Sequence, residues 1–348
     1  MMETLENTNI DQFKLFPGTR YMGSKRKIIP QMWKILKNYH FNSFYDAFAG
    51  SNIVSYFMKC QGKRVVTNDI MALSHSMSKA VIENSLVKLT EEELNSLICT
   101  PHRNNFIQRT YNGIFFNELE NSFLDRVRGN IENIESSYKK HIALTSLARA
   151  CMKKQSRGIF TFVGERYNDG REDMQKSIED HFIESVKSYN KAIFDNGEKN
   201  IAYNRSAEKS RINVDLVYLD PPYFTPNSDN DYTRRYHFVE GLVKNWEGLE
   251  IQNHTLTKKF MSYKTPFSKK GSAYAAFNEL FEKYRNSIIA ISYSSNSLPT
   301  KHELLEMLSK HKTQVEVHEI DHTYSFGNQG DKIGNSANRV KEYLFIGS

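Results

Sequence analysis

The chain has 348 residues, 39% hydrophobic and 25% charged, an ordinary globular composition that argues against disordered and fibrous proteins. A net charge of +7 favours a polyanionic partner. A membrane span or a secreted disulfide framework is not expected, because no apolar run approaches about 18 residues and Cys60, Cys99 and Cys151 lie far apart; these features predict a cytoplasmic protein.

The first chemical signal is the basic sequence RYMGSKRK at residues 20–27, which follows a polar leader of about 16 residues. Apolar residues at helical spacing then predict a helix that runs to about residue 39, with Gly23 as a turn and Ser24 as its N-cap. Unpaired backbone N–H groups at a helix start attract anions, and Lys25 would add to them. The alternative is a solvent-exposed basic helix start.

A strand, a glycine turn and a helix are predicted over residues 43–60, where SFYDAFAGSN precedes an apolar segment. A second strand at residues 64–69 ends at Asp69, which lies 19 positions after Gly50. In nucleotide-binding folds an acidic residue about 20 positions after the turn accepts hydrogen bonds from ribose hydroxyls. This joint spacing indicates a nucleotide-like ligand, although the turn lacks a full GxGxxG.

Residues 90–205 are predicted to form a helical insertion between two halves of a sheet domain, because this region lacks strand–helix alternation. Apolar residues at helical spacing from 131 to 151 indicate one amphipathic helix. Residues 136–164 contain six basic side chains and no acidic one: Lys139, Lys140, Arg149, Lys153, Lys154 and Arg157. Such a stretch suits phosphate contact, and the alternative is a solvated helix face.

The central motif is Asp220-Pro221-Pro222-Tyr223, which follows an apolar run at residues 215–219. The run predicts a buried strand, and two prolines must end it because neither has an N–H for the sheet ladder. Ligands bind at the carboxyl ends of the strands in open α/β sheets. The motif offers a carboxylate, a carbonyl and an aromatic face, a set suited to a planar amino-bearing group. The alternative is an ordinary proline turn.

Basic residues recur after this motif, first in a predicted long polar loop that contains Arg234 and Arg235. Residues 254–270 then carry five lysines interleaved with aromatic residues: Lys258, Lys259, Lys264, Lys269 and Lys270. This pattern suits phosphate contact together with base stacking. His237 is expected to be structural. The remaining sequence predicts strands at 287–292, 314–320 and 342–346 and helices at 277–284 and 301–311.

With these motifs in hand, the chain resembles the Dam-like (D12 class) adenine-specific DNA N6-methyltransferases. The motifs that carry the resemblance are RYMGSK, DAFAGSN, TND, VYLDPPY and SYSS at 292–295, in this order. One departure concerns the family's F-x-G-x-G turn, whose last glycine is replaced by Asn52. Asparagine tolerates unusual backbone angles better than most residues, so the turn is expected to survive.

The resemblance implies a Rossmann-like sheet with a reversed final strand and S-adenosylmethionine as the cofactor. It places the cofactor against Tyr21, Lys25, Asp46, Phe48, Gly50, Asp69 and Asp220. The catalytic motif would be Asp220 to Tyr223, with the methyltransferase domain formed by residues 17–89 and 206–348. The insertion at 90–205 has no motif that the resemblance covers; it is expected to recognise the target sequence because it is large enough to read bases. No metal is expected.

The chemistry of Asp220 can also be argued from the residues alone. The amino nitrogen of adenine is a poor nucleophile because its lone pair is delocalised into the ring. Hydrogen bonds from this amine to the Asp220 carboxylate and the Pro221 carbonyl would strengthen as positive charge develops in the transition state. A duplex hides the amine, so the base must be flipped out, with Tyr223 stacking on it.

The favoured function is therefore site-specific methylation of adenine in double-stranded DNA, in a restriction-modification or related system that would include a cognate restriction enzyme. The expected DNA contacts are Arg149, Lys153, Arg157, Arg234, Arg235, Lys258, Lys259 and Lys264, of which the first three are the candidates for contacts to base edges. Alternatives are the same chemistry on RNA adenine or on a protein amide, and a non-catalytic DNA-binding subunit. The complete DPPY motif and Asp69 argue against the last of these.

Overall fold

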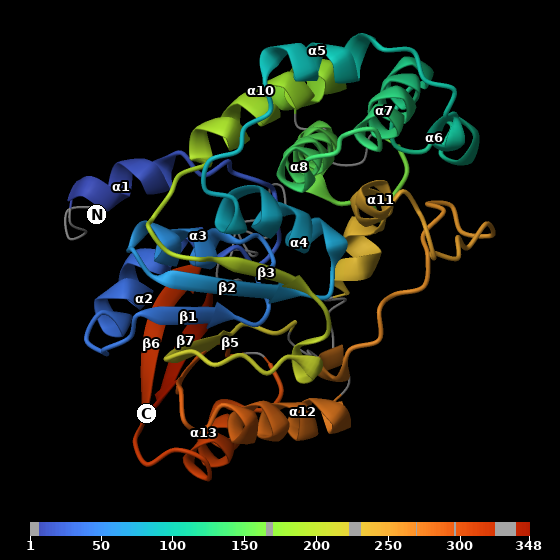
Figure 1. Ribbon diagram of the computed structural model, residues 1–348. Coiled ribbons are helices and arrows are strands. Elements are labelled where there is room, and N and C mark those ends of the chain that lie inside the picture. The colour runs from blue at the N-terminus through green and yellow to red at the C-terminus, as the bar shows by residue number, and fades with distance from the viewer. Residues whose placement is uncertain (1–6, 165–169, 223–230, 269, 296, 324–338) are drawn as a thin grey trace.

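The structure is a computed structural model that describes residues 7–164, 170–222, 231–268, 270–295, 297–323 and 339–348 (Figure 1). Within these residues, seven strands form one sheet. They are β1 (Ser43–Asp46), β2 (Arg64–Asp69), β3 (Ile201–Asn204), β4 (Leu216–Leu219), β5 (Ile288–Ser294), β6 (Val315–Thr323) and β7 (Arg339–Gly347).

The strand order is β3-β2-β1-β4-β5-β7-β6. Strands β1 to β5 pair in parallel, whereas β7 lies antiparallel between β5 and β6. This arrangement confirms the predicted Rossmann-like α/β class and the reversed final strand. The carboxyl ends of β1, β2 and β4 consequently meet at one edge of the sheet.

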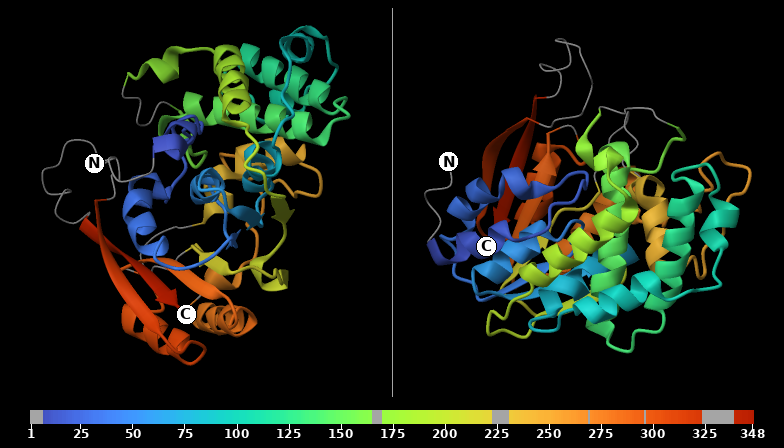
Figure 2. Two further views of the ribbon diagram at one scale, coloured as in Figure 1. Left: turned by 60° about the vertical axis from the view of Figure 1, so that its left-hand side comes forward. Right: turned by 90° about the horizontal axis from the view of Figure 1, so that it is seen from above.

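Helices cover both faces of the sheet, which explains why its central strands are apolar throughout. All four residues of β4 are buried. Successive side chains alternate between two hydrophobic cores, so Phe44 and Leu216 pack on one face and Tyr45 and Val217 on the other. Figures 1 and 2 show α12 and α13 on one side of the sheet and the remaining helices on the other.

Helices of the first sheet segment are α1 (Asn7–Lys14), α2 (Ile29–Leu36), α3 (Ile53–Cys60) and α4 (Ala72–Ser78). The helical layer contains α5 (Glu91–Cys99), α6 (Phe106–Thr110), α7 (Glu118–Ile131), α8 (Ser137–Lys154), α9 (Glu172–Gln175) and α10 (Ile178–Ala192). The last helices are α11 (Tyr232–Lys244), α12 (Lys270–Lys283) and α13 (Lys301–Ser309). Short helical turns are η1 (Lys25–Lys27), η2 (Lys79–Glu83), η3 (Ser156–Gly158), η4 (Ala207–Lys209) and η5 (Pro266–Ser268).

Helix α8 forms the centre of the predicted insertion and packs against α4, α7, α10 and α11. It is buried along most of its length from Ile142 to Met152, which joins the insertion to the same hydrophobic core as α3 and α4. The segment 90–205 also includes β3, which pairs with β2 and therefore belongs to the sheet. The purely helical part of the insertion ends with α10.

The prediction of one helix from residue 131 to 151 is wrong in extent. Ile131 ends α7 and α8 begins at Ser137, with Ile134 in the connection between them. Ile131 is fully buried, and Ile134 is partly buried against the same core. Two elements that turn apolar side chains toward one core can therefore imitate the spacing of a single helix.

The predicted polar loop around Arg234 is also wrong, because these residues belong to α11. The Asp231 side chain accepts a hydrogen bond from the Arg234 N–H and caps the helix. Tyr236, Val239 and Leu242 then bury one face of it. The charged residues of α11 obscured an apolar pattern at helical spacing.

The helix after the first basic motif begins later than expected. The turn η1 precedes α2, and the Ser24 side chain makes no capping hydrogen bond. Pro30 instead lies in the first turn of α2, where its missing N–H costs nothing. Ser24 is therefore the N-cap residue of η1 and not of α2, and the predicted side-chain cap of the long helix is wrong.

Candidate functional site

Three carboxylates lie at the carboxyl edge of the parallel strands. Asp46 ends β1, Asp69 ends β2, and Asp220 follows β4 directly. Asp46 pairs in register with Thr67 of β2 and Tyr218 of β4, so the three acidic residues are brought to adjacent positions of the sheet. All three line one cavity with a volume of about 980 Å³.

Segments far apart in the chain form the walls of this cavity. They are the basic motif around residues 21–25, the turn at 46–54, the ends of β2 and β4, the start of α11, and residues 261–266. Of the predicted cofactor residues, Tyr21, Lys25, Asp46, Phe48, Gly50, Asp69 and Asp220 all line the cavity. The sequence motifs therefore converge on one site, although they span 200 positions.

The turn after β1 adopts the backbone conformation that the sequence required. Gly50 has φ of +48° and Asn52 has φ of +61°, both in the left-handed region. The Asn52 amide nitrogen donates to the Ser74 carbonyl at 2.9 Å, which fixes the turn to α4. The expectation that asparagine can replace the family's last glycine is confirmed. A Cβ on Gly50 would lie 3.3 Å from the Tyr21 ring, so this residue also allows close approach.

Asp69 accepts two backbone hydrogen bonds, one to each carboxylate oxygen. The Gly50 N–H donates to Oδ2 at 2.8 Å and the Met71 N–H donates to Oδ1 at 2.8 Å. Burial raises the pKa of Asp69 to about 6, although both amides counteract the shift. The Ser74 side chain adds a further hydrogen bond, and a carboxylate with about four acceptor positions can still accept one from a ligand. The carboxylate can therefore hold the glycine turn and a ligand hydroxyl together.

Asp46 is the most deeply buried of the three carboxylates, with 1% of its surface exposed. The Ser55 hydroxyl donates to Oδ2 at 2.6 Å and the Phe48 N–H donates to Oδ1 at 3.3 Å. Burial, and to a smaller extent the nearby Asp220 carboxylate, raise the pKa of Asp46 to about 7. An ionised Asp46 is thus costly in the ligand-free protein and favours a cationic ligand.

Asp46→Asn is expected to stabilise the ligand-free protein more as the pH rises. The carboxyl titrates near 3.8 when unfolded and near 7 when folded, so its stabilising contribution is present below pH 3.8 and is lost as the pH rises through 7. The difference in free energy of unfolding between variant and wild type should therefore grow by at most about 1.4 kcal/mol per pH unit in this window. Denaturant unfolding from about pH 4 to pH 8 measures it; a pH-independent difference contradicts the prediction.

Three tyrosines form a stack beside the carboxylates. The Tyr21 ring lies 4.9 Å from the Tyr236 ring at 11° and 5.8 Å from the Tyr232 ring at 26°. The Tyr236 hydroxyl accepts a 2.7 Å hydrogen bond from the Met22 N–H. Helix α11 thereby fixes Tyr21 against Gly50. Burial raises the pKa of Tyr21 well above its usual value, so its hydroxyl remains protonated.

Lys25 is buried among acidic residues rather than exposed on a helix start. Its Nζ lies 3.1 Å from Asp220 Oδ1 and 2.7 Å from Glu342 Oε1, and the side chain is 4% exposed. An exposed basic helix start is thus ruled out for this lysine. Because its charge is already paired with the Asp220 and Glu342 carboxylates, Lys25 is not a site for a separate anion.

The proline motif turns away from the sheet at the cavity wall. Pro221 is buried, and Pro222 lines the cavity with Asp220. Tyr223 lies outside the described residues. His237 is fully buried with Nε2 2.8 Å from the Phe160 carbonyl oxygen, and burial lowers its pKa to about 4. This geometry agrees with the structural role predicted for His237.

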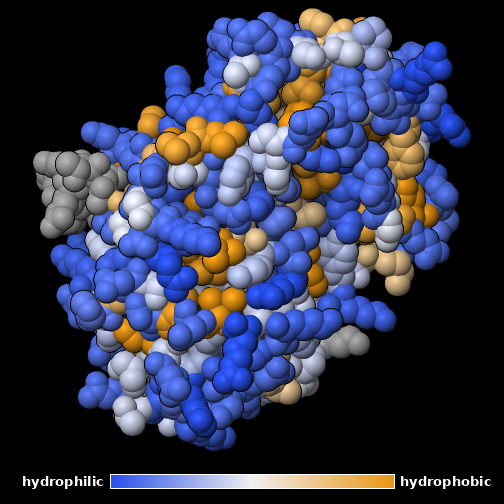
Figure 3. All heavy atoms as spheres, in the orientation of Figure 1, coloured by the Kyte–Doolittle hydropathy of each residue, from blue (hydrophilic) through white to orange (hydrophobic). Residues whose placement is uncertain are grey.

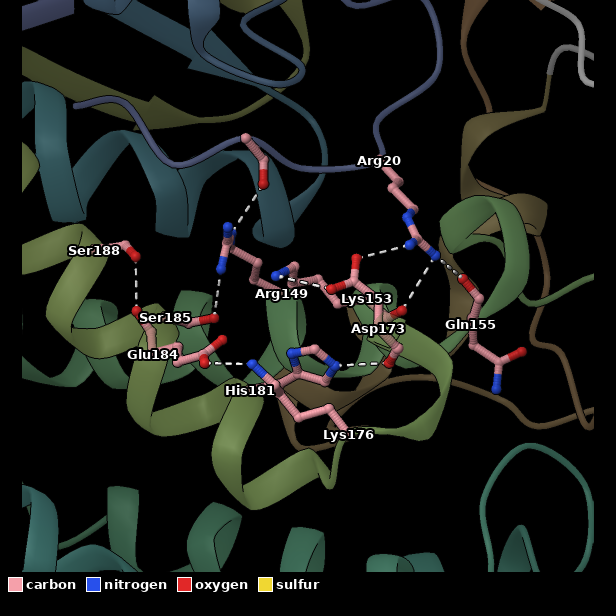
Figure 4. Close-up of polar contacts among 11 residues, drawn as sticks. Arg20, Arg149, Lys153, Gln155, Asp173, Lys176, His181, Glu184, Ser185 and Ser188 are labelled. Carbon is pink, nitrogen blue, oxygen red and sulfur yellow. Dashed lines mark hydrogen bonds and ion pairs between the residues drawn. The ribbon is translucent and has the colours of Figure 1, made fainter. Parts of the chain in front are cut away.

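Of the predicted DNA contacts in the insertion, Arg149 and Lys153 of α8 make polar contacts within the protein (Figure 4). Arg149 is 8% exposed, and its guanidinium donates to the Gly18 carbonyl at 3.0 Å and to Ser185 Oγ at 2.8 Å. This geometry does not favour a base contact. Lys153 is 21% exposed and lies 3.3 Å from Asp173 Oδ1. Arg157 is half-buried, at a left-handed position with φ of +63°.

The basic residues after β4 are more accessible. Arg234 on α11 and Lys264 are exposed, and Lys264 lines the cavity. Arg235 is half-buried and donates to Met22 Sδ at 2.9 Å. Lys258 and Lys259 are half-buried and belong to the loop 251–260, which projects beside α11 in Figure 1. Lys269 lies outside the described residues.

Three contributors to the site were not predicted from the sequence. Glu342 of β7 contacts Lys25, and Tyr232 stacks on Tyr21. Glu240 of α11 accepts hydrogen bonds from the Ala72 and Leu73 N–H groups, both at 2.8 Å. It thereby caps α4 and ties it to α11. An acidic residue within an apolar strand, as in KEYLFIG, is the signal that could have indicated Glu342.

The described part of the chain contains no group of three or more His, Cys, Asp or Glu side chains that could hold a metal ion. No described helix is both long and apolar enough to cross a membrane. Hydrophilic side chains predominate on the face in Figure 3, and hydrophobic ones lie between them in separate patches.

Comparison with known proteins gives one family. The sequence model of the D12 class N6 adenine-specific DNA methyltransferases matches residues 21–307. The chain is 29% identical to the type II methyltransferase M2.HphI of Haemophilus parahaemolyticus, over 95% of this chain and 97% of that protein. It is 25% identical to modification methylase StsI of Streptococcus sanguinis, over 84% of this chain and 46% of the relative. It therefore spans nearly all of the first relative but about half of the second.

Proposed function

The chain belongs to the D12 class N6 adenine-specific DNA methyltransferases, and we propose that it transfers a methyl group from S-adenosylmethionine to the N6 amine of a flipped adenine at a specific site in double-stranded DNA. The observation that carries this proposal is the convergence of Asp46, Asp69 and Asp220 on one cavity. Asp220 follows β4, the strand that leads into the proline motif. Asp46 and Asp69 end β1 and β2, the strands that form a nucleotide-type site.

The cavity fits S-adenosylmethionine in size and charge. Its volume of about 980 Å³ is at the upper end of small-ligand sites, which span about 300–1,000 Å³. The carboxylates suit a ligand with a positively charged sulfur and amino group. Asn68 adds a buried acceptor, because it lines the cavity and its Oδ1 has no hydrogen-bond partner among the described residues.

The cofactor, when bound, supplies a methyl group on a positively charged sulfur. We assign the remaining acceptor capacity of Asp69 to the ribose hydroxyls of the cofactor. The ring of Tyr21 would form a flat wall against the cofactor. Asp46 and Phe48 border its methionine part, at the glycine turn that Gly50 keeps narrow. The tyrosine stack from α11 keeps this wall rigid before the ligand arrives.

The Asp220 carboxylate and the Pro221 carbonyl are assigned to the target amine. Both would accept its N–H groups and draw the nitrogen toward a tetrahedral geometry. These bonds become stronger as positive charge develops on the nitrogen, so they stabilise the transition state more than the ground state. Pro222 lies beside them in the cavity wall, and Tyr223 is proposed to stack on the extruded base.

A direct assay tests this assignment. Protein, S-adenosylmethionine with a labelled methyl group, and separate DNA, RNA and protein substrates should yield label in DNA alone. Digestion of the DNA to nucleosides should place that label on N6 of adenine. Label in RNA or in a protein amide would contradict the choice of substrate, and a lack of transfer to all three would favour a non-catalytic DNA-binding subunit.

The basic residues near the cavity mouth are proposed to hold the phosphate backbone. Arg234→Ala and Lys264→Ala should each weaken DNA binding at every sequence and reduce the slope of log K against log salt by roughly one unit, because one phosphate contact is lost. The methylated sequence should not change. Binding titrations at several salt concentrations, with sequencing of methylated sites, measure both properties.

Lys310 provides a matched control. It is exposed at the end of α13, shortly before β6, whose first residue lies beside Gly347 at the amino edge of β5. This is the edge opposite the cavity, so Lys310→Ala should leave the salt slope unchanged. An equal loss of slope in the Lys310 and Lys264 variants would contradict the proposed position of the DNA.

Sequence readout is assigned to residues 90–205, because this insertion is large and its helices lie on one side of the sheet. Within it, Lys153 and Arg157 remain the candidates for base contacts. The relatives named modification methylases support a further proposal, that the chain protects DNA from a cognate restriction enzyme. DNA methylated by this chain should then resist one restriction enzyme that cuts the same unmethylated DNA.

A further inference from the structure

Glu342 is a fully buried carboxylate outside the set of residues proposed to hold the cofactor and the target amine. It lies on β7 with 0% of its side chain exposed. Its Oε1 accepts hydrogen bonds from Lys25 Nζ at 2.7 Å and from Ser292 Oγ of β5 at 2.8 Å. It also lies beyond residues 21–307, which the family model matches. A buried carboxylate costs several kcal/mol without a charged partner, so its position calls for a specific reason.

Lys25 connects Glu342 to the reaction centre. Its ammonium group lies 2.7 Å from Glu342 Oε1 and 3.1 Å from Asp220 Oδ1, so one cation is shared between two carboxylates. The sheet explains how this happens. Glu342 pairs in register with Ser294 at the end of β5, and β5 lies next to β4, which Asp220 follows. The reversed strand β7 thus brings a carboxylate to the edge where ligands bind.

The surroundings of Asp220 are otherwise mostly acidic or neutral. The Asp46 carboxylate interacts with Asp220 electrostatically, as do the hydroxyls of Tyr218 and Tyr232. Arg235 of α11 also influences Tyr232, and Lys25 influences both tyrosines. Lys25 forms an ion pair with Asp220, with 3.1 Å between Nζ and Oδ1. The charge on Asp220 therefore depends on how firmly Lys25 is held.

We propose that Glu342 is a positioning residue for methyl transfer: it shares Lys25 with Asp220, so that the ammonium group favours the Asp220 carboxylate without pairing with Asp220 alone. This proposal rests on the assignment of Asp220 to the target amine. The Lys25 ammonium group lies closer to Glu342, at 2.7 Å, than to Asp220, at 3.1 Å. Without Glu342, Lys25 would pair fully with Asp220 and compete with the amine for its lone pairs.

The test is the pH dependence of single-turnover methyl transfer to adenine-unmethylated genomic DNA. Its acid limb follows protonation of the cavity carboxylates, among which Asp220 is the one that forms the ion pair with Lys25. In Glu342→Gln the amide oxygen can still accept the Lys25 hydrogen bond, but a negative charge near Asp220 is removed. Ionisation of Asp220 becomes easier, so the acid limb should move to lower pH by about one unit, the lower end of the effect of an adjacent charge. The plateau rate should fall roughly tenfold because the Asp220–amine bonds weaken.

Lys25→Met should shift the profile in the opposite direction. It leaves two carboxylates without their shared cation, so ionisation of Asp220 becomes harder and the acid limb moves to higher pH by about one unit. The double variant Lys25→Met/Glu342→Gln removes one charge of each sign and should return the limb toward its wild-type position. A role in folding alone would not produce opposite shifts that cancel in the double variant.

The control is Glu319→Gln, which removes the same charge from an exposed side chain on the neighbouring strand β6. Its profile should match the wild type. Thermal unfolding of each variant shows which proteins are folded, and rates are compared for folded protein only. If Asp220 proves essential while both single variants keep the wild-type acid limb, the role of Glu342 is refuted and the proposed function stands. If Asp220→Ala retains wild-type turnover, the assignment of Asp220 itself fails.

Discussion

Asp220→Ala is expected to reduce methyl transfer to DNA by at least about 10²–10³-fold, the loss seen when one stabilising group is removed from a transition state. The carboxylate follows β4 and lines the cavity, where it is proposed to accept an N–H of the target amine. Affinity for S-adenosylmethionine should change much less than the rate. Single-turnover kinetics with saturating cofactor and DNA separate the chemical step from binding.

Asp215→Ala is the matched control for this experiment. Asp215 lies immediately before β4, at the other end of the same strand, and its Oδ2 accepts hydrogen bonds from the Asn42 and Ser43 N–H groups, both at 2.8 Å. Its loss should lower stability but not the rate per folded molecule. Near-normal turnover in the Asp220 variant would exclude the proposed mechanism. An equal rate loss in both variants would indicate that strand β4, and not the carboxylate, had been disturbed.

Asp69→Asn should weaken binding of S-adenosylmethionine by roughly 1.5–3 kcal/mol, or about 10- to 150-fold, the scale of a hydrogen bond to a charged group. The asparagine amide oxygen can still accept the hydrogen bond from the Met71 N–H. The substitution removes the negative charge and the second carboxylate oxygen, which accepts the hydrogen bond from the Gly50 N–H in the wild type. Calorimetric titration measures the affinity for S-adenosylmethionine. DNA binding measured without S-adenosylmethionine should be unchanged. Unaltered cofactor affinity in a folded variant would remove Asp69 from the site.

Local sequence signals were sufficient for the sheet and for much of the cavity. Short apolar strands that end in Asp46, Asp69 and Asp220 predict where the carboxylates meet, because parallel strands share a carboxyl edge. The left-handed backbone at Asn52 was also predictable, since few other residues tolerate it. Each of these inferences depends on residues close together in the chain, for which the backbone itself sets the geometry.

The parts that could not be predicted depend on contacts between distant segments. No sequence signal near Arg149 indicates that its guanidinium donates hydrogen bonds to Gly18 and Ser185. The sequence alone therefore predicts a DNA contact for this charge. The pairing of Lys25 with Glu342 joins residues 317 positions apart. Only the reversed strand β7 brings them together, and a sequence pattern does not reveal which buried acid will meet which buried base.

The large sequence separation between Lys25 and Glu342 affects when the site is completed during synthesis of the chain. The glycine turn, Asp69 and Asp220 leave the ribosome early, yet β7 cannot enter the sheet until residues 339–347 have been made. Contacts of such long sequence separation form late and slowly, because loop closure precedes any stabilisation. A nascent or truncated chain that ends before β7 would therefore expose the edge of β5 and leave Lys25 without Glu342. We expect methyl transfer to begin only after β7 has joined the sheet, because the sheet beside β5 and the surroundings of Lys25 are incomplete before that step.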